Sequence, residues 1–139
     1  MRGRILVDTG PLVAFLNHRD RLHQWAATQL AAIAPPLLTC EAVLAETCHL
    51  VRNLEGGHEA VMKLIEGGAV TVPFRLDQEI GPVAKLLRKY ADVPISLADA
   101  CLVRLAEQVA DSAVLTVDAD FRVYRKHGRQ VIPTILPRS

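Results

Sequence analysis

Two aspartates come directly after short apolar runs in which a buried strand is expected to end. Asp8 follows residues 5–7, Ile-Leu-Val, and Asp118 follows residues 113–117, Ala-Val-Leu-Thr-Val. Short runs rich in branched residues and bounded by turn residues are typical of buried strands. Because ligands bind where the carboxyl ends of parallel strands meet, we expect both carboxylates at one edge of a sheet. The alternative for Asp8 is a structural role in supporting the start of the next helix.

Two further carboxylates lie in segments with helical spacing. In the helix predicted for residues 39–54, Glu46 falls at the edge of an apolar stripe that includes Leu50, at about 100° per residue. Glu41 lies in the first turn of that helix, where the helix dipole favours an acid. Glu46 has no such explanation in mid-helix, so it is the better functional candidate.

The fourth carboxylate, Asp99, also has a structural explanation. The sequence Ser96-Leu97-Ala98-Asp99 matches a capping box, in which the serine and the acid satisfy each other's backbone donors. Asp99 nevertheless stands among apolar residues, where burying an acid is costly. After the strand at 113–117, Asp118 and Asp120 are common turn formers. A single shared function explains four acids at one sheet edge more simply than four separate structural roles.

Carboxylates gathered in one place repel one another unless protons or cations intervene. Hard oxygen ligands select Mg²⁺, with Mn²⁺ as a substitute. Mg²⁺ usually takes only one or two protein carboxylates and keeps waters or substrate phosphates, so four acids suit two ions or one ion acting partly through water. Such a centre would activate water and neutralise charge on a phosphoryl group.

Strands and helices alternate along the chain. The predicted strands are 5–7, 37–38, 69–72, 113–117 and 130–136, the last at a sheet edge because of Pro133. The predicted helices are 11–16, 22–33, 39–54, 60–65, 77–90, one beginning at Ser96 and a short one after Asp120. Thr9 or Gly10 is expected to cap the first helix and Thr39 the third. In the helix at 77–90, Gly81-Pro82 predicts a kink or the true first turn.

This alternation implies right-handed crossovers and helices on both faces of the sheet. The predicted fold class is α/β, a three-layer α/β/α sandwich around a mostly parallel sheet of about five strands. We interpret residues 1–139 as a single domain, long enough to bury a core.

The composition limits the classes of partner and compartment. A formal net charge of +1 excludes polyanion binding through bulk charge, so nucleic-acid contact requires a local patch. One basic stretch follows Asp120 without any further acid, although a solvated basic face is its simpler explanation; it contains Arg122, Arg125, Lys126, Arg129 and Arg138. Three cysteines without a paired motif favour a reducing compartment, and we expect the cytoplasm and no membrane segment.

Four short motifs follow one another along nearly the whole chain. They are Asp8-Thr9 after an apolar strand, Leu44-Ala45-Glu46 in a helix, Ser96-Leu97-Ala98-Asp99-Ala100 at a helix start, and Leu115-Thr116-Val117-Asp118-Ala119-Asp120-Phe121. As an ordered set they resemble the PIN-domain nucleases, specifically the VapC-like toxins of prokaryotic toxin–antitoxin pairs. The chain departs from the family pattern at Val117, where many relatives carry a polar or basic residue.

This resemblance implies a magnesium-dependent endoribonuclease that acts on single-stranded or structured RNA. It also implies a neutralising antitoxin and a homodimer, and apolar residues in the first helical region, Leu16 and Trp25, favour a homodimer as well. The residues that the resemblance assigns are an acidic, metal-binding catalytic quartet and three supporting residues: Asp8, Glu46, Asp99 and Asp118, with Thr9 and Thr116 as donors and Asp120 as an auxiliary ligand.

Three other interpretations fit the sequence less well. A non-catalytic RNA-binding or partner-binding PIN-like module would not need the intact quartet. A phosphoryl-accepting signalling domain needs a lysine near a late strand, and none follows the strand before Asp118. A haloacid-dehalogenase-type phosphatase needs a second aspartate two residues after Asp8, where Gly10 stands.

Overall fold

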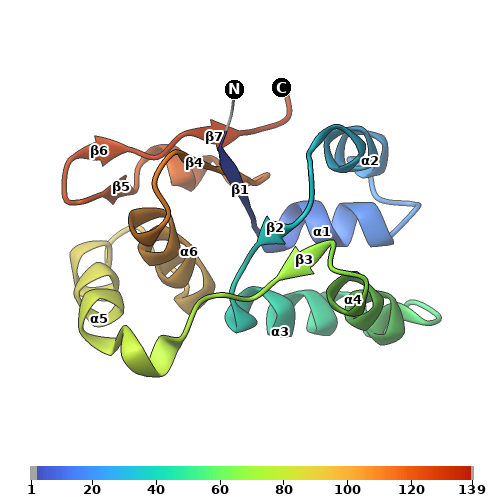
Figure 1. Ribbon diagram of the computed structural model, residues 1–139, viewed down its shortest axis with the longest axis horizontal. Helices are drawn as coiled ribbons and strands as arrows, with labels where there is room; N and C mark the ends of the chain where they lie inside the picture. The colour runs from blue at the N-terminus through green and yellow to red at the C-terminus, as the bar shows by residue number, and fades with distance from the viewer. Residues whose placement is uncertain (1–2, 139) are drawn as a thin grey trace.

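The computed structural model describes residues 3–138, and its central feature is a five-stranded parallel sheet. The strands are β1 (Arg4–Val7), β2 (Leu37–Leu38), β3 (Val70–Thr71), β4 (Ser112–Leu115) and β7 (Thr134–Ile135). Their order across the sheet is β3-β2-β1-β4-β7, and each neighbouring pair is parallel. Helices flank the sheet, which confirms the predicted α/β/α sandwich (Figure 1).

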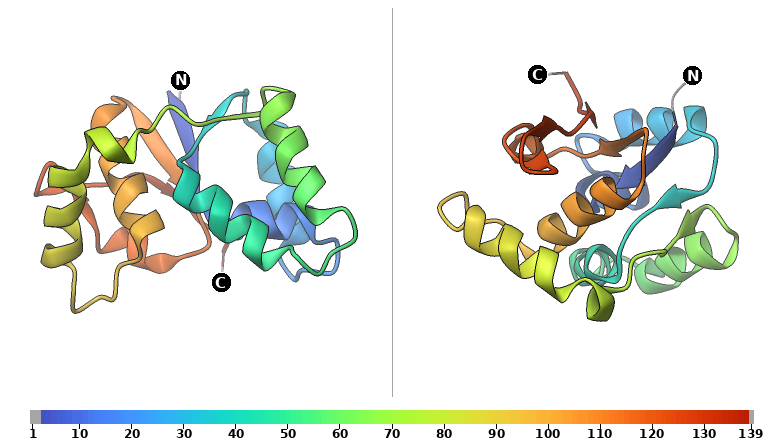
Figure 2. Two further views of the ribbon diagram at one scale, coloured as in Figure 1. Left: turned by 90° about the horizontal axis from the view of Figure 1, so that it is seen from below. Right: turned by 60° about the vertical axis from the view of Figure 1, so that its left-hand side comes forward.

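The connections between strands are helical. The helices are α1 (Thr9–Leu16), α2 (His23–Ala32), α3 (Glu41–Leu50), α4 (Gly57–Glu66), α5 (Ile80–Lys89) and α6 (Leu97–Gln108), with 3₁₀ turns η1 (Leu76–Gln78) and η2 (Ala119–Arg122). Figure 1 shows α1 and α2 on one side of β1 and the pair α5 and α6 on the other. Figure 2 shows α5 lying alongside α6. None of the helices within residues 3–138 combines the length and apolar character needed to cross a membrane.

The order of the strands places the carboxyl ends of β1 and β4 side by side. β1 pairs with β2 on one side and with β4 on the other. From β1 the chain adds β2 and β3 toward one edge of the sheet and then β4 and β7 toward the other edge, so the strand order reverses between β1 and β4. Val7 lies opposite Leu115, and the Asp8 N–H donates to the Leu115 carbonyl at 3.0 Å. Crevices at such a reversal are where open α/β sheets bind ligands.

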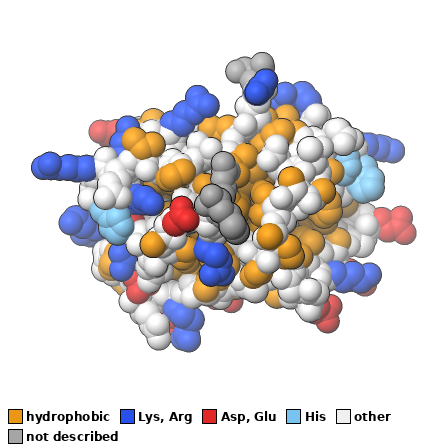
Figure 3. All heavy atoms as spheres, turned by 45° about the horizontal axis from the view of Figure 1, so that its top comes forward, with side chains coloured by type: hydrophobic (Ala, Val, Ile, Leu, Met, Phe, Trp, Pro, Cys, Tyr) orange, Lys and Arg blue, Asp and Glu red, His pale blue; other side chains and the backbone are white. Residues whose placement is uncertain are grey.

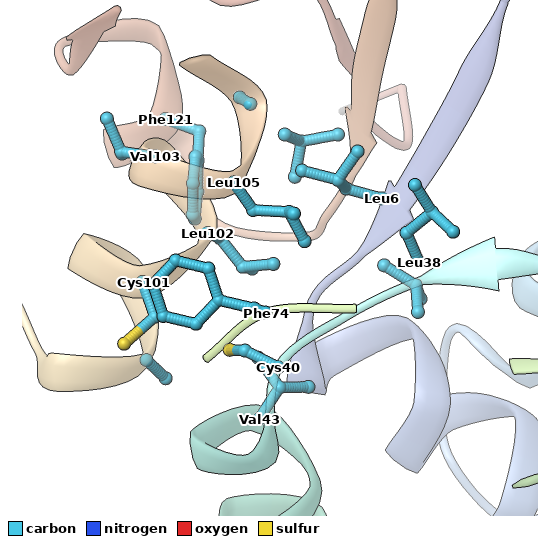
Figure 4. Packing of buried hydrophobic residues seen from close by; sticks show 14 of the residues in the cluster. Leu6, Leu38, Cys40, Val43, Phe74, Cys101, Leu102, Val103, Leu105 and Phe121 are labelled. Carbon is cyan, nitrogen blue, oxygen red and sulfur yellow. The ribbon is translucent and has the colours of Figure 1, made fainter. Parts of the chain in front are cut away.

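The hydrophobic core joins the sheet to α6 (Figure 4). Leu6 and Val7 of β1 have no exposed surface, as expected for a central strand of a parallel sheet covered by helices. α6 is buried on several faces, and Leu102 and Val103 have no exposed surface either. Because β1 and α6 are both buried in this core, the start of α6 has a fixed position relative to the end of β1. Asp99, at the start of α6, is therefore fixed relative to Asp8.

Two predicted helix caps are wrong. Asp8 itself is the N-cap of α1, because its carboxylate accepts the N–H of Thr9. The helix therefore begins at Thr9, two residues before the predicted start at Pro11. Cys40 holds the N-cap position of α3 without a side-chain bond. Thr39 instead donates its hydroxyl to the Val7 carbonyl at 2.8 Å, which ties the end of β2 to the end of β1.

The last segment also differs from the prediction. The single strand expected at 130–136 is divided, because Pro133 interrupts it. Its first part, β6 (Gln130–Val131), pairs antiparallel with β5 (Arg125–Lys126) in a separate hairpin, and β7 forms the sheet edge. Gly128 adopts a φ of 81° in the turn of this hairpin, a conformation that glycine adopts without strain. Gly81 and Pro82 lie in the first turn of α5, one of the two expected positions.

Candidate active site

An open pocket of about 410 Å³ lies at the carboxyl edge of the sheet. Residues from six parts of the chain line it: the end of β1, α1, the loop after α1, α3, the start of α6 and the loop after β4. The loop after α1 contributes an acid that the sequence analysis did not single out, Asp20. All four carboxylates of the predicted quartet are among the lining residues, namely Asp8, Glu46, Asp99 and Asp118. Their convergence on one pocket follows from the parallel sheet, as expected from the sequence.

Asp8 is the most deeply buried of these acids, with 6% of its surface exposed. One carboxylate oxygen accepts the N–H of Thr9 at 2.8 Å, and the other accepts the hydroxyl of Thr116 at 2.7 Å. Burial, with smaller contributions from the charges of Asp99 and Asp118, nevertheless raises the pKa of Asp8 to about 6. Asp8 is therefore a rigidly held carboxylate whose charge the fold alone does not fully compensate.

Thr116 links the first carboxylate to the loop that follows β4. It has no exposed surface, and its hydroxyl oxygen accepts the N–H of Asp118 at 2.9 Å while donating to Asp8. The carboxylate of Asp118 in turn accepts the N–H of Asp120 at 2.9 Å and forms the N-cap of η2. Asp120 is exposed and is not among the residues that line the pocket, so its contact with the site runs through its backbone.

Asp99 combines both roles that the sequence suggested. Its N–H donates to the Ser96 hydroxyl at 3.0 Å, and its carboxylate accepts the Ser96 N–H at 3.4 Å, which confirms the capping box. It also lines the pocket. Burial is the main factor that raises the pKa of Asp99, opposed by the hydrogen bonds to its carboxylate. Capping therefore does not remove Asp99 from the acidic group.

Tyr124 is a contact of the site that the sequence did not reveal. It is completely buried, and its hydroxyl donates to the Asp99 carboxylate at 3.1 Å. Its ring packs edge-to-face with those of Tyr90 and Phe121, at 5.1 and 5.2 Å between centroids. Tyr124 and Asp99 are 25 positions apart in the sequence, and Tyr124 belongs to none of the four sequence motifs.

Glu46 approaches the pocket from α3 and is exposed, whereas Glu41 lies in the first turn of the same helix and is not among the lining residues. This placement agrees with the choice between the two glutamates. The predicted burial of Leu50 is wrong. Leu50 is 53% exposed and lines the same pocket, because α3 ends there and nothing within residues 3–138 covers it.

Thr9 contributes a buried hydroxyl to the pocket wall. It is 4% exposed, and within the described residues its side-chain oxygen is the one buried side-chain polar atom without a hydrogen-bond partner. A buried hydroxyl without a partner is costly. The pocket therefore contains one unsatisfied polar atom beside the most deeply buried acid.

Comparison with known proteins identifies the fold family. The sequence model of the PIN domain matches residues 5–127. The chain belongs to the PIN domain family. Ribonuclease VapC26 of Mycobacterium tuberculosis is 29% identical over 116 residues, which cover 82% of this chain and 86% of that protein.

A solved structure shares the arrangement of the PIN domain described above. The crystal structure of VapC20 of Mycobacterium tuberculosis, a sarcin-ricin loop cleaving toxin, superposes with a TM-score of 0.76. The match covers 86% of this chain and 93% of VapC20, at 24% sequence identity, and it shows a common fold. The predicted resemblance to VapC-like PIN domains is thus confirmed.

The polar side chains that line the pocket of this PIN domain are carboxylates and the hydroxyls of Thr9 and Ser96, and such oxygen donors suit Mg²⁺ or Mn²⁺. Within residues 3–138, no three acidic, histidine or cysteine side chains converge closely enough to hold one ion directly. This spacing fits a hydrated Mg²⁺, which commonly takes one or two carboxylates and retains water. The raised pKa of Asp8 and the unpaired Thr9 hydroxyl are consistent with a cation here. Metal binding by these residues stays a prediction.

Proposed function

We propose that this PIN domain is a metal-dependent endoribonuclease that hydrolyses RNA phosphodiester bonds and acts as the toxin of a toxin–antitoxin pair. The observation that carries the proposal is the pocket in which the four predicted carboxylates, each from a separate part of the chain, meet. The substrate class is supported by the names of the relatives, a ribonuclease and a toxin that cleaves the sarcin-ricin loop.

The proposed roles follow from how each carboxylate is held. Asp8 is fixed by Thr9 and Thr116, and Asp99 by the capping box and Tyr124, so both keep their orientation before substrate arrives. Mg²⁺, when bound, would activate water and neutralise charge that develops on the phosphoryl group. Preorganised groups of this kind avoid reorganisation at the moment of reaction.

Glu46 and Asp118 complete the proposed set from less enclosed positions. Glu46 is exposed on α3, and its side chain is free to adjust to a hydrated ion or to a water molecule. Asp118 is half-buried, and one of its oxygens accepts the Asp120 N–H. We assign these two acids to metal and water contacts that form fully only with substrate.

The proposal includes partners and a compartment. We propose an antitoxin protein that neutralises the enzyme, a homodimer, and a location in the cytoplasm, where RNA is found and where free cysteines such as Cys40 and Cys101 stay reduced. Light scattering at micromolar concentration tests the homodimer, and a monomer there would contradict it.

The direct test is RNA cleavage by purified protein freed of antitoxin. We expect cleavage in Mg²⁺ or Mn²⁺, none in chelator, and none by Asp8→Asn under any of these conditions. Cleavage that persists in chelator would contradict the metal-dependent mechanism. RNA binding without cleavage in Mg²⁺ would favour the alternative, a non-catalytic RNA-binding module.

A further inference from the structure

A second cleft, of about 430 Å³, lies between α5, α6 and the β5–β6 hairpin, apart from the acidic pocket. The two cavities have no lining residue in common. The charged and titratable side chains that line the cleft are mostly basic: Lys85, Lys89, Arg104, Arg125 and His127, with Glu107. One residue of the basic stretch that follows Asp120, Arg125, thus lies in the wall of this cleft.

The acids near this cleft are already paired with a single arginine. Arg104 donates to Glu79 at 2.7 Å and to Glu107 at 3.2 Å. Lys85 and Lys89 are exposed and form no ion pair within residues 3–138. Several Lys and Arg side chains lie on the left of Figure 3, the side that carries the hairpin in Figure 1, and others lie along the top and the right.

The hairpin that forms one wall is anchored to both helices. The Lys89 ammonium donates to the Gly128 carbonyl at 3.1 Å, and the His127 N–H donates to the Glu107 carboxylate at 2.7 Å. The guanidinium of Arg125 donates to the carbonyls of Arg122, Val123 and Tyr124, which fixes this side chain at the rim. The charges of Lys89 and Arg125 are therefore held in defined positions.

A pair of tyrosines separates the cleft from the acidic pocket. Tyr124 bonds Asp99 in the pocket, and the next residue, Arg125, lines the cleft and donates its N–H to the Tyr90 hydroxyl at 2.8 Å. Along α6, Asp99 and Glu107 are about 12 Å apart at 1.5 Å per residue. An RNA strand that passes the carboxylates is long enough to reach the cleft within a few nucleotides.

We propose that this cleft binds backbone phosphates of the RNA substrate on one side of the cleavage site, an inference that rests on the proposed ribonuclease function. Lysine ammonium groups without acidic partners are suited to phosphate oxygens. The nearby rings of Tyr90 and Tyr124 are buried and offer no surface on which a base stacks. The contact is therefore with the backbone and is independent of base sequence.

The test measures RNA binding in chelator, where no metal-dependent cleavage occurs. The variants are Lys85→Gln/Lys89→Gln and, because Lys89 also holds the hairpin, Lys85→Gln alone. The matched control is Lys63→Gln/Arg75→Gln, which removes the same charge from exposed positions outside the cleft. Fluorescence anisotropy with a labelled single-stranded RNA is read across a series of KCl concentrations, and thermal melts check that each variant is folded.

Each phosphate contact on single-stranded nucleic acid contributes about −0.7 to the slope of log K against log salt. We expect the slope to become less negative by about 1.4 for the double variant and by about 0.7 for Lys85→Gln, with wild-type behaviour in the control. Equal effects in the control and the double variant, or an unchanged slope in Lys85→Gln, would overturn the proposal.

These measurements test the RNA-binding role of the cleft separately from the proposed ribonuclease activity. If wild type binds RNA with the expected slopes but does not cleave it in Mg²⁺, the ribonuclease proposal fails, whereas the assignment of the cleft to RNA phosphates stands. If wild type cleaves RNA but the Lys85 and Lys89 variants bind it as wild type does, the cleft proposal fails alone.

Discussion

Replacing Asp8 by asparagine removes a charge that the fold buries, and the structure gives the size of the effect. Raising the pKa of Asp8 from 3.8 to about 6 corresponds to a cost of about 3 kcal/mol for the ionised form, at about 1.4 kcal/mol per pKa unit. Asparagine retains an oxygen for the Thr9 N–H but loses the acceptor of the Thr116 hydroxyl, a loss of about 1 kcal/mol.

We therefore expect Asp8→Asn to stabilise the metal-free protein by about 2 kcal/mol at neutral pH, or roughly 6 °C in melting temperature, while abolishing RNA cleavage. The difference in stability between Asp8→Asn and wild type depends on pH. From about pH 6 down to about pH 4, the folded protein binds a proton on Asp8 that the unfolded chain has released, so wild type loses stability as pH rises through this range. The advantage of the variant should vanish near about pH 4.5.

Urea denaturation in chelator, at neutral pH and at low pH, measures both effects. The matched control is Asp120→Asn, which removes the same charge from an exposed side chain and should change stability by less than about 0.5 kcal/mol. An Asp8→Asn protein that is no more stable than wild type at neutral pH, or whose advantage is independent of pH, would refute the reasoning from burial.

Three further predictions concern individual contacts. Glu46→Gln should lose most RNA cleavage in Mg²⁺ whereas Glu41→Gln keeps it; equal activities would show that Glu46 was wrongly chosen. Tyr124→Phe should destabilise the fold by about 1 kcal/mol in thermal melts and should also slow cleavage, and wild-type cleavage would limit Tyr124 to a structural role. Gly10→Ala places a Cβ in steric conflict with a methyl group of Val117. It should cost about 1–3 kcal/mol in urea denaturation, and adding Val117→Ala should restore most of that loss unless the strain lies elsewhere.

The sequence was sufficient to predict the sheet and the meeting of the carboxylates, because both follow from local patterns. The run before Asp8 and the run before Asp118 have no competing helical period, and a parallel sheet brings the ends of its strands to one edge. The capping box at Ser96 and Asp99 is equally local, because its two partners are three residues apart. Each of these features depends on neighbours in the sequence.

The features that sequence reasoning missed depend on contacts between distant segments. The Thr39 hydroxyl, just after β2, donates to the Val7 carbonyl at the end of the neighbouring strand β1. This contact replaces the capping of α3 that the sequence predicts for Thr39. Tyr124 meets Asp99 only because the segment that follows η2 lies against the start of α6. Leu50 fits the buried stripe of α3 by spacing, but it is the last residue of the helix and lies at the pocket, where nothing in residues 3–138 covers it.

The central claim, that the acidic pocket binds a divalent metal ion, is tested most directly by thermal melts of Asp99→Asn in chelator and in Mg²⁺. Asparagine keeps an acceptor for the Ser96 N–H but removes the charge. Ser96→Ala is the matched control, because it removes the cap, at a cost of about 1 kcal/mol under both conditions, and keeps the carboxylate.

Wild type and Ser96→Ala should both gain stability from Mg²⁺, by about 2.7 kcal/mol when Mg²⁺ is at 100 times its Kd. Asp99→Asn should gain much less and should not cleave RNA. Equal gains in all three proteins, with RNA cleavage retained by Asp99→Asn, would contradict the account and would leave Asp99 as a helix cap alone.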